Sequence, residues 1–302
     1  MNYILGVDCG GTKTEAEAYS LDGKLLASST YGFGNVIVDY EAGLSHIKEA
    51  INAIFEKLPK EKCVGITLGI AGIDSGGLKT KVKSDLSVIH ENIHLINDGQ
   101  LAHYSILKGA DGVTVTAGTG SVILGLEDNQ WFRVGGWGHL FGDEGGAYFI
   151  AKRGIQEALK EYDNNQSPSE LTKKIFNYFG VTTVLELTKK VYSLDKGDLA
   201  ASAIVVANLA ENNHTAASII NEAGEDLATG ILQCLNKMPE LEKPIKIGLN
   251  GSVVEKNQHV LEALSRKLDQ ENLVYELNIK KESCAKGAYY LNQRNGDKKW
   301  EN

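Results

Sequence analysis

The chain has 302 residues, and its 42 % hydrophobic and 23 % charged content is ordinary for a folded globular protein long enough to form two domains. Its 39 acidic and 31 basic residues give a net charge of −8, which offers nucleic acid or an anionic membrane surface no long-range attraction. The sequence has no run of 18 apolar residues and no charged leader before an apolar segment, so we expect a cytoplasmic protein without a membrane span or signal peptide.

Short strands and helices alternate in the first third of the chain. Apolar and small residues over 3–7, 15–19 and 25–29, joined by tight turns, predict a three-stranded meander. Asp39 precedes apolar residues at helical spacing that continue to Pro59, which predicts a capped helix. The next predicted elements are a strand at 63–71, a helix at 76–89, a strand at 93–97 and a helix at 100–108.

The same order of elements begins again after residue 112. Residues 113–117, 121–127 and 130–134 predict a second meander, and a helix-rich insertion follows over about 144–238. The remaining predicted elements are a strand at 245–249, a helix at 258–268, a strand at 273–277 and a helix at 282–291. We therefore expect an α/β protein whose two lobes repeat the order β-β-β-α-β-α-β-α and face each other across a cleft. The expected lobes are residues 1–111, completed by a C-terminal helix at 282–302, and residues 112–281.

A glycine-rich turn follows the first strand of each predicted meander. The two turns contain Gly10, Gly11 and Thr12 and, in the second half, Gly118, Thr119 and Gly120. Residues without Cβ accept positive φ and leave backbone N–H groups open to an anion. Neither turn fits the P-loop or the dinucleotide-binding fingerprint. One turn from each lobe would hold a polyphosphate from both sides.

Four cysteines are spread along the chain, at Cys9, Cys63, Cys234 and Cys284. They form no CxxC pair and no cluster with histidine, which argues against a disulfide framework or a structural zinc site. We expect all four to be reduced and packed as small apolar side chains.

Five segments carry a family resemblance. They are GVDCGGTKTEA at 6–16, NDGQLAHYS at 97–105, AGTGS at 117–121, GGWGHLFGDEGGAYFIA at 135–151 and GLNGS at 248–252. In this order and spacing they resemble the N-acetylglucosamine kinases, which belong to the BadF/BadG/BcrA/BcrD ATPase subgroup of the sugar kinase, actin and Hsp70 ATPase superfamily. The resemblance implies two actin- or ribonuclease H-like lobes, ATP and a sugar in the cleft between them, and a homodimer.

The resemblance also implies which residues bind ATP. Asp8 would hold a Mg²⁺ ion that bridges the β- and γ-phosphates, although an aspartate that only caps the turn is the alternative. Lys13 would add positive charge or remain a solvated surface lysine. The full set of implied nucleotide contacts is Asp8, Gly10, Gly11, Thr12, Lys13, Gly118, Thr119, Gly120, Gly251 and Ser252.

Asp98 is the candidate general base. It follows an apolar strand, and a carboxylate there can take the proton of the sugar 6-hydroxyl as that hydroxyl attacks the γ-phosphorus. The alternative is a helix N-cap. Trp137 matches the sugar-binding loop, and its alternative role is core packing. The residues implied to bind sugar are Asn35, Asp98, Gly136, Trp137, Gly138 and Asp143.

The expected activity is ATP-dependent phosphorylation of N-acetylglucosamine at the 6-hydroxyl, with N-acetylmuramic acid as a further candidate acceptor. Two alternatives remain: a glucosamine kinase, and a BadF-type ATPase or activator that acts as a nucleotide switch. Activators of this type hold a [4Fe-4S] cluster through two mid-chain cysteines in each subunit. This sequence has no cysteine between Cys63 and Cys234, which disfavours the activator.

Overall fold

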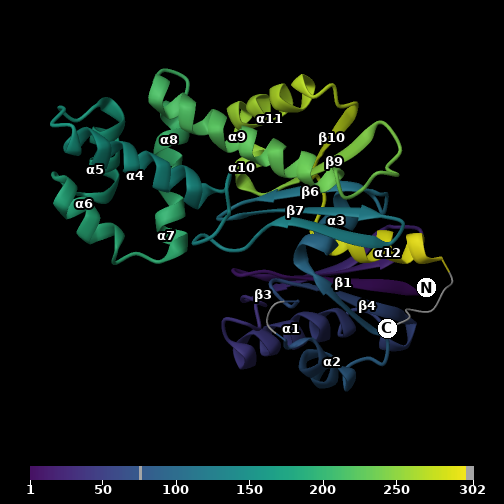
Figure 1. Cartoon of the computed structure of the whole chain (residues 1–302). Helices are drawn as coiled ribbons and strands as arrows, with labels where there is room; N and C mark the ends of the chain where they lie inside the picture. The colour runs from purple at the N-terminus through teal and green to yellow at the C-terminus, as the bar shows by residue number, and fades with distance from the viewer. Residues whose placement is uncertain (75–76, 297–302) are drawn as a thin grey trace. The chain divides into compact units, whose positions relative to one another are not determined.

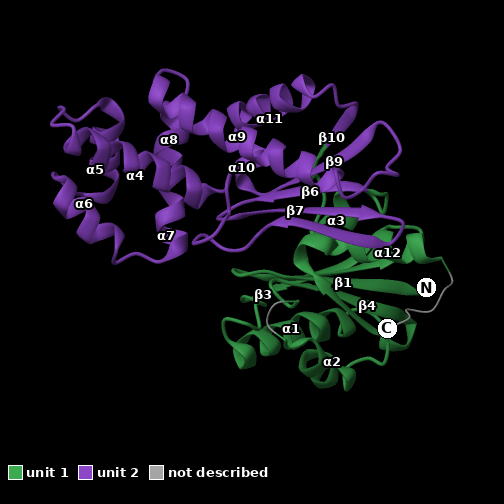
Figure 2. Ribbon diagram, viewed as in Figure 1, with its two compact units in different colours: residues 1–111, 278–302 green, residues 112–277 purple. Residues whose placement is uncertain are grey.

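The computed structural model describes residues 1–74 and 77–296, which divide into two compact units (Figures 1 and 2). Unit 1 consists of residues 1–111 and the segment that begins at Asn278, and unit 2 consists of residues 112–277. The expected lobes break after residue 111 and after residue 281. Residues 76 and 297–302, which fall in two of the expected helices, lie outside the described residues.

Unit 1 is built on a five-stranded sheet with the strand order β3-β2-β1-β4-β5. Its strands are β1 (Tyr3–Cys9), β2 (Thr14–Ser20), β3 (Leu25–Tyr31), β4 (Cys63–Ile70) and β5 (Ile93–Asn97). Its helical elements are α1 (Tyr40–Phe55), η1 (Lys60–Lys62), α2 (Lys79–Ser87), α3 (Asp98–Ile106), η2 (Cys284–Lys286) and α12 (Gly287–Asn295). The predicted cap of α1 is confirmed, because the Asp39 side chain accepts a hydrogen bond from Ala42 N at 3.1 Å.

The central strand β1 has two buried faces. Its odd-numbered residues from Tyr3 to Cys9 pack in one apolar core with α1 and α2. On the opposite face Gly6 lies against the 3₁₀ turn η2, so closely that a Cβ at this position would be 1.9 Å from Ala285 O. The sheet can therefore receive the C-terminal segment only because position 6 carries no side chain.

Unit 2 is built on a second five-stranded sheet with the order β10-β9-β6-β7-β8. Its strands are β6 (Gly112–Ala117), β7 (Ser121–Glu127), β8 (Gln130–Gly135), β9 (Ile245–Asn250) and β10 (Tyr275–Ile279), the last of which crosses the unit boundary. Its helices are α4 (Ala147–Asp163), α5 (Glu170–Phe179), α6 (Val184–Val191), α7 (Lys196–Ala201), α8 (Ala203–Leu209), α9 (His214–Leu235), α10 (Ser252–Lys256) and α11 (Gln258–Gln270).

The two sheets repeat one topology, which confirms the predicted duplication. Written from the other end, the second order is β8-β7-β6-β9-β10, and it matches β3-β2-β1-β4-β5 strand for strand. In both sheets the first strand pairs antiparallel with the second and parallel with the fourth. Helices α4 to α9 stand where unit 1 has only α1 and the short turn η1, so the helical insertion belongs to unit 2.

Three predicted elements are displaced. The terminal helix expected at 282–291 is instead the 3₁₀ turn η2 followed by α12, which begins at Gly287. The other two are displaced by about two residues. Helix α3 begins at Asp98 rather than at residue 100, because Asn97 is its N-cap. Strand β10 begins at Tyr275 rather than at residue 273, because Leu273 N donates to Leu268 O and closes the end of α11.

The four cysteines are free and buried, as expected. Within residues 1–74 and 77–296, no helix combines the length and apolar character needed to cross a membrane.

The close contact at Gly6 predicts a strong effect of a small substitution. Gly6→Ala forces the new methyl group against Ala285 O, and overpacking of this kind costs about 1–3 kcal/mol. Thermal denaturation should show a lower melting temperature, by roughly 2–4 °C per kcal/mol. Gly11→Ala is the matched control, since a Cβ there meets no atom within 4 Å. Equal melting temperatures for the two variants would contradict the packing argument.

Candidate active site

The first glycine turn, between β1 and β2, is exposed. Gly10 N donates to Lys13 O at 3.0 Å and closes the turn, while Gly34 N donates to Gly10 O at 2.9 Å. Gly11 and Thr12 lie at its exposed tip, and no other described residue accepts their N–H groups. Both N–H groups are therefore available to an anion. Lys13 forms an ion pair with Glu15 at 3.1 Å, with its side chain 54 % exposed.

Asn35 is held close to this turn by its neighbour in sequence. A Cβ on Gly34 would be 2.5 Å from Thr14 Oγ1 and 2.8 Å from Cys9 Cβ, so the chain before Asn35 passes directly over the ends of β1 and β2. The Oδ1 atom of Asn35 accepts a hydrogen bond from Ile37 N at 3.0 Å. Its amide NH₂ group remains as a donor for a sugar hydroxyl.

The two candidate carboxylates of unit 1 lie at the same edge of the sheet. The parallel register aligns Cys9 of β1 with Ile70 of β4 and Asn97 of β5, so Asp8 precedes this row and Asp98 follows it. The N-cap role that was the alternative for Asp98 belongs to Asn97, whose side chain accepts from Gly99 N at 2.9 Å in a capping box with Gln100. Asp98 is thus not required to cap α3.

Both carboxylates are perturbed electrostatically. The pKa of Asp8 is raised to about 7, chiefly by burial and also by the negative charges of Asp98 and Glu15, while Lys280 and Lys13 act in the opposite direction. Burial also raises the pKa of Asp98, the charge of Asp74 adds to this, and a hydrogen bond from Gly99 N acts in the opposite direction. Two partly buried like charges at one edge favour the arrival of a proton or a cation.

The residues fit a magnesium ion held mainly by its substrate. Among the described residues no group of three or more His, Cys, Asp or Glu side chains could hold a metal ion. Mg²⁺ in phosphate-transfer sites keeps several waters and takes only one or two carboxylates together with the phosphates. Asp8, with its raised pKa and its place beside the first turn, can supply such a carboxylate.

The second glycine turn, between β6 and β7, is fixed by the start of α4. Gly118 N donates to Gly120 O at 2.9 Å, while Ala147 N and Tyr148 N donate to Gly118 O and Thr119 O at 2.8 and 3.0 Å. None of the turn glycines 10, 11, 118 and 120 adopts a positive φ, so the expectation that they are needed for that conformation is wrong. Gly120 is instead required by space: a Cβ there would be 2.3 Å from Asp143 Oδ2.

Gly251 and Ser252 lie next to this turn. Gly251 has a φ of 100°, and a Cβ on it would be 2.5 Å from Ala117 O, so both conformation and space demand glycine. Ser252 and Thr119 line one cavity of about 680 Å³ in unit 2. The rest of its wall consists mainly of small and apolar residues of α4, α7 and α8, together with Asn208, Lys256, Asn257, Gln258 and His259.

The loop after β8 has an unusual backbone. Positive φ values occur at Gly135, Gly136, Gly138, Asp143 and Gly145. Asp143 is the one residue of this set that is not glycine. The residue is 4 % exposed, and its carboxylate accepts a hydrogen bond from Lys196 Nζ at 2.7 Å. The ion pair with Lys196 therefore ties this loop to α7.

Trp137 is 67 % exposed, which excludes the core-packing alternative. The guanidinium of Arg133 lies over one face of the indole at 4.5 Å and donates to the carbonyls of Gly135 and Gly136. The remaining face of the indole is available to an apolar sugar face. Trp137 also borders a second cavity of about 690 Å³, together with Glu144 and Asp226.

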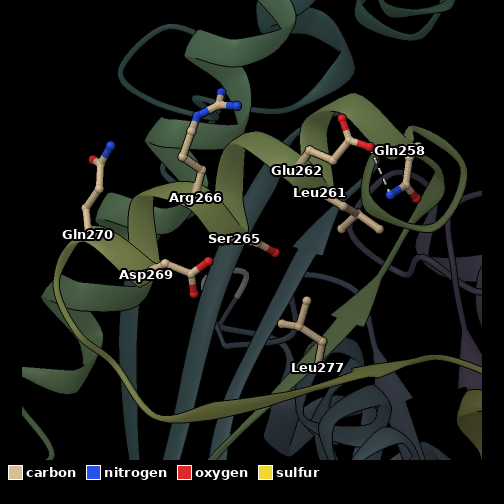
Figure 3. Close-up of a pocket in the computed structure, with 8 residues that line it drawn as sticks. All are labelled: Gln258, Leu261, Glu262, Ser265, Arg266, Asp269, Gln270 and Leu277. Carbon is tan, nitrogen blue, oxygen red and sulfur yellow. Dashed lines mark hydrogen bonds between the residues drawn. The ribbon is translucent and has the colours of Figure 1, made fainter.

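Sequence reasoning missed Asp226 and Lys196. Burial and the charge of Glu222 raise the pKa of Asp226 to about 6. Neither residue stands in a glycine-rich segment, so no local signal marked them. A further pocket, along α11 and Leu277, contains none of the predicted site residues (Figure 3).

Comparison with known proteins gives a consistent family. The BadF/BadG/BcrA/BcrD ATPase family profile matches residues 5–289. A Clostridium acetobutylicum protein named N-acetylmuramic acid/N-acetylglucosamine kinase is 24 % identical over 302 residues, covering 96 % of this chain and 98 % of the relative. The N-acetyl-D-glucosamine kinase of Dictyostelium discoideum is 31 % identical over 204 residues, covering 63 % of this chain and 64 % of its own.

A solved structure from Chromobacterium violaceum shares the fold, with a TM-score of 0.76, 24 % identity and coverage of 96 % of this chain and 99 % of its own. Because the family profile spans nearly the whole chain, the chain belongs to the BadF/BadG/BcrA/BcrD ATPase family.

Proposed function

We propose that this chain is an ATP-dependent amino-sugar kinase that phosphorylates the 6-hydroxyl of N-acetylglucosamine and, as a second acceptor, N-acetylmuramic acid. The observation that carries the proposal is the state of Asp98. Its pKa is raised by burial, it stands at the carboxyl end of a parallel strand, and Asn97 relieves it of helix capping. A carboxylate that is a stronger base than usual suits proton transfer from an alcohol.

Unit 1 would supply the base and part of the phosphate site. Asp98 would accept the hydroxyl proton, and Asn35 would orient the sugar through its amide group. Asp8 would bind Mg²⁺, which neutralises charge on the transferred phosphoryl group when bound. Gly10, Gly11, Thr12 and Lys13 would contact the phosphates.

Unit 2 would supply the nucleotide cavity and the sugar loop. Gly118, Thr119 and Gly120 would contact the phosphates, with the N–H groups of Thr119 and Gly120 as donors because Gly118 N already donates to Gly120 O. Gly251 and Ser252 would contact the adenosine in the cavity of about 680 Å³. Trp137 would cover the sugar ring with its open face, and Gly136 and Gly138 would contact the acetamido group. Asp143 would accept a sugar hydroxyl through Oδ1, since Lys196 already uses Oδ2.

The names of the two curated relatives support the acceptor class, since both are kinases of N-acetylated amino sugars. An ATP-dependent enzyme of this kind works where ATP is present, and we therefore propose a cytoplasmic location and, from the family resemblance, a homodimer.

The direct test is a coupled ADP-release screen over N-acetylglucosamine, N-acetylmuramic acid, glucosamine and glucose. We expect the highest kcat/KM for the N-acetylated sugars. A preference for glucosamine would favour the alternative kinase. ATP hydrolysis that no sugar accelerates would contradict the proposal and favour the nucleotide switch.

Asp98→Asn keeps the size of the side chain and removes the base. We expect kcat for sugar phosphorylation to fall by about 10²–10⁴-fold, while a non-hydrolysable ATP analogue still binds by calorimetry. Asp39→Asn is the matched control, because asparagine caps a helix about as well as aspartate. Turnover close to that of the wild type in Asp98→Asn would remove Asp98 from the mechanism.

Asp8→Asn tests how much the buried charge of Asp8 lowers the free energy of unfolding. A carboxyl pKa raised from 3.8 to about 7 means that the folded state favours the protonated form, so the stability contribution is full below pH 3.8, declines as the pH rises towards 7 and is lost above it. Without Mg²⁺ and ATP, Asp8→Asn should melt above the wild type at pH 8, with each kcal/mol of stabilisation raising the melting temperature by about 2–4 °C, and should melt level with it only below the unfolded pKa of 3.8. A difference independent of pH would contradict the shifted pKa.

A further inference from the structure

An ion pair joins the helical insertion to the loop that follows β8. Lys196 is the first residue of α7, and its Nζ lies 2.7 Å from Asp143 Oδ2. The side chain of Asp143 is 6 % exposed and that of Lys196 is 34 % exposed, so the carboxylate is buried while the ammonium group remains reachable. The pair spans 53 residues of sequence.

The Asp143 carboxylate lies directly against the second glycine turn. A Cβ built on Gly120 would be 2.3 Å from Oδ2 and 3.1 Å from Oδ1. Since Lys196 Nζ contacts the same Oδ2 atom, the ammonium lies one carboxylate away from Gly120. The positive charge is therefore held beside the turn whose N–H groups are proposed to bind phosphate.

The residue after Lys196 lies in the wall of the nucleotide cavity. Gly197 lines the cavity of about 680 Å³ together with Thr119 and Ser252. No aspartate or glutamate is among the described residues that line this cavity, whereas Lys256 and His259 are. The lining is thus complementary to an anionic ligand, and Lys196 adjoins it on the side of the glycine turn.

We propose that Lys196 binds the phosphate chain of the nucleotide. This rests on the proposed function, since it assigns the cavity to ATP. A lysine ammonium has three N–H donors and Asp143 takes one of them, which leaves two for phosphate oxygens. An ammonium is a compact point charge, well suited to oxygens that gain negative charge during phosphoryl transfer.

The proposal differs from a purely structural role in what it predicts for ligands. A structural ion pair supports α7 and the cavity wall, so its loss weakens the binding of every ligand of the cavity by the same factor. A phosphate contact matters to ligands that carry phosphates and not to adenosine. Comparing the two ligands separates the two roles.

The first experiment measures Kd for magnesium AMP-PNP and for adenosine, by calorimetry and competition, without sugar. A hydrogen bond to a charged group contributes about 1.5–3 kcal/mol, so Lys196→Gln should raise the Kd of AMP-PNP roughly 10–100-fold. The factor by which the Kd of adenosine rises should be smaller by roughly fivefold or more. Lys190→Gln is the matched control, since Lys190 is an exposed lysine of the same insertion. Equal weakening of both ligands, or no change, would overturn the proposal.

The second experiment uses the wild-type chain and so does not depend on the folding of a variant. An amine-reactive label should modify Lys196, whose side chain is partly exposed. Mass spectrometry should show that AMP-PNP slows this labelling and that adenosine does not, while labelling of Lys190 stays constant. Protection by both ligands or by neither would contradict a phosphate contact.

The outcomes also separate this proposal from the proposed function. A chain in which AMP-PNP protects Lys196 but no amino sugar is phosphorylated contradicts the acceptor assignment alone. A chain that phosphorylates N-acetylglucosamine with Lys196 insensitive to AMP-PNP contradicts the phosphate contact alone.

Discussion

Two carboxylates kept partly out of water at one edge of the first sheet are the constraint on which the rest of the proposed site depends. Asp8 and Asp98 end up there because β1, β4 and β5 run parallel in a fixed register. Within residues 1–74 and 77–296 neither carboxylate forms an ion pair, and burial raises the pKa of both. An arrangement that costs folding free energy and serves no packing role is typical of a functional site.

The topology and the backbone features that carry the site could be predicted from the sequence. The repeated meander could be predicted because strand periodicity and turn residues are local signals, and each sheet contains the three strands of one expected meander. The reason why the turn positions carry glycine could not be predicted in the same way. Their φ values are ordinary, and Gly120 is needed because Asp143, 23 positions later, fills the space beside its Cα.

Some features depend on contacts between distant segments, which a single sequence does not specify. Nothing local distinguishes Asn97 from Asp98 as the cap of α3, since both residue types cap helices well. Lys196 stands in the helical insertion, 53 positions after Asp143, and only folding brings the two side chains together. The cavity that includes Thr119 and Ser252 likewise draws its wall from α4, α7, α8 and the segment after β9.

The close fit of Gly6 to Ala285 has a consequence for how the protein is made. Residues 112–277 are one uninterrupted stretch, so unit 2 can fold as soon as that stretch has left the ribosome. The sheet of unit 1 is translated before unit 2, yet one face of β1 is covered by η2 and α12, which are translated after unit 2. Unit 1 can therefore reach its final structure only after unit 2 has been translated.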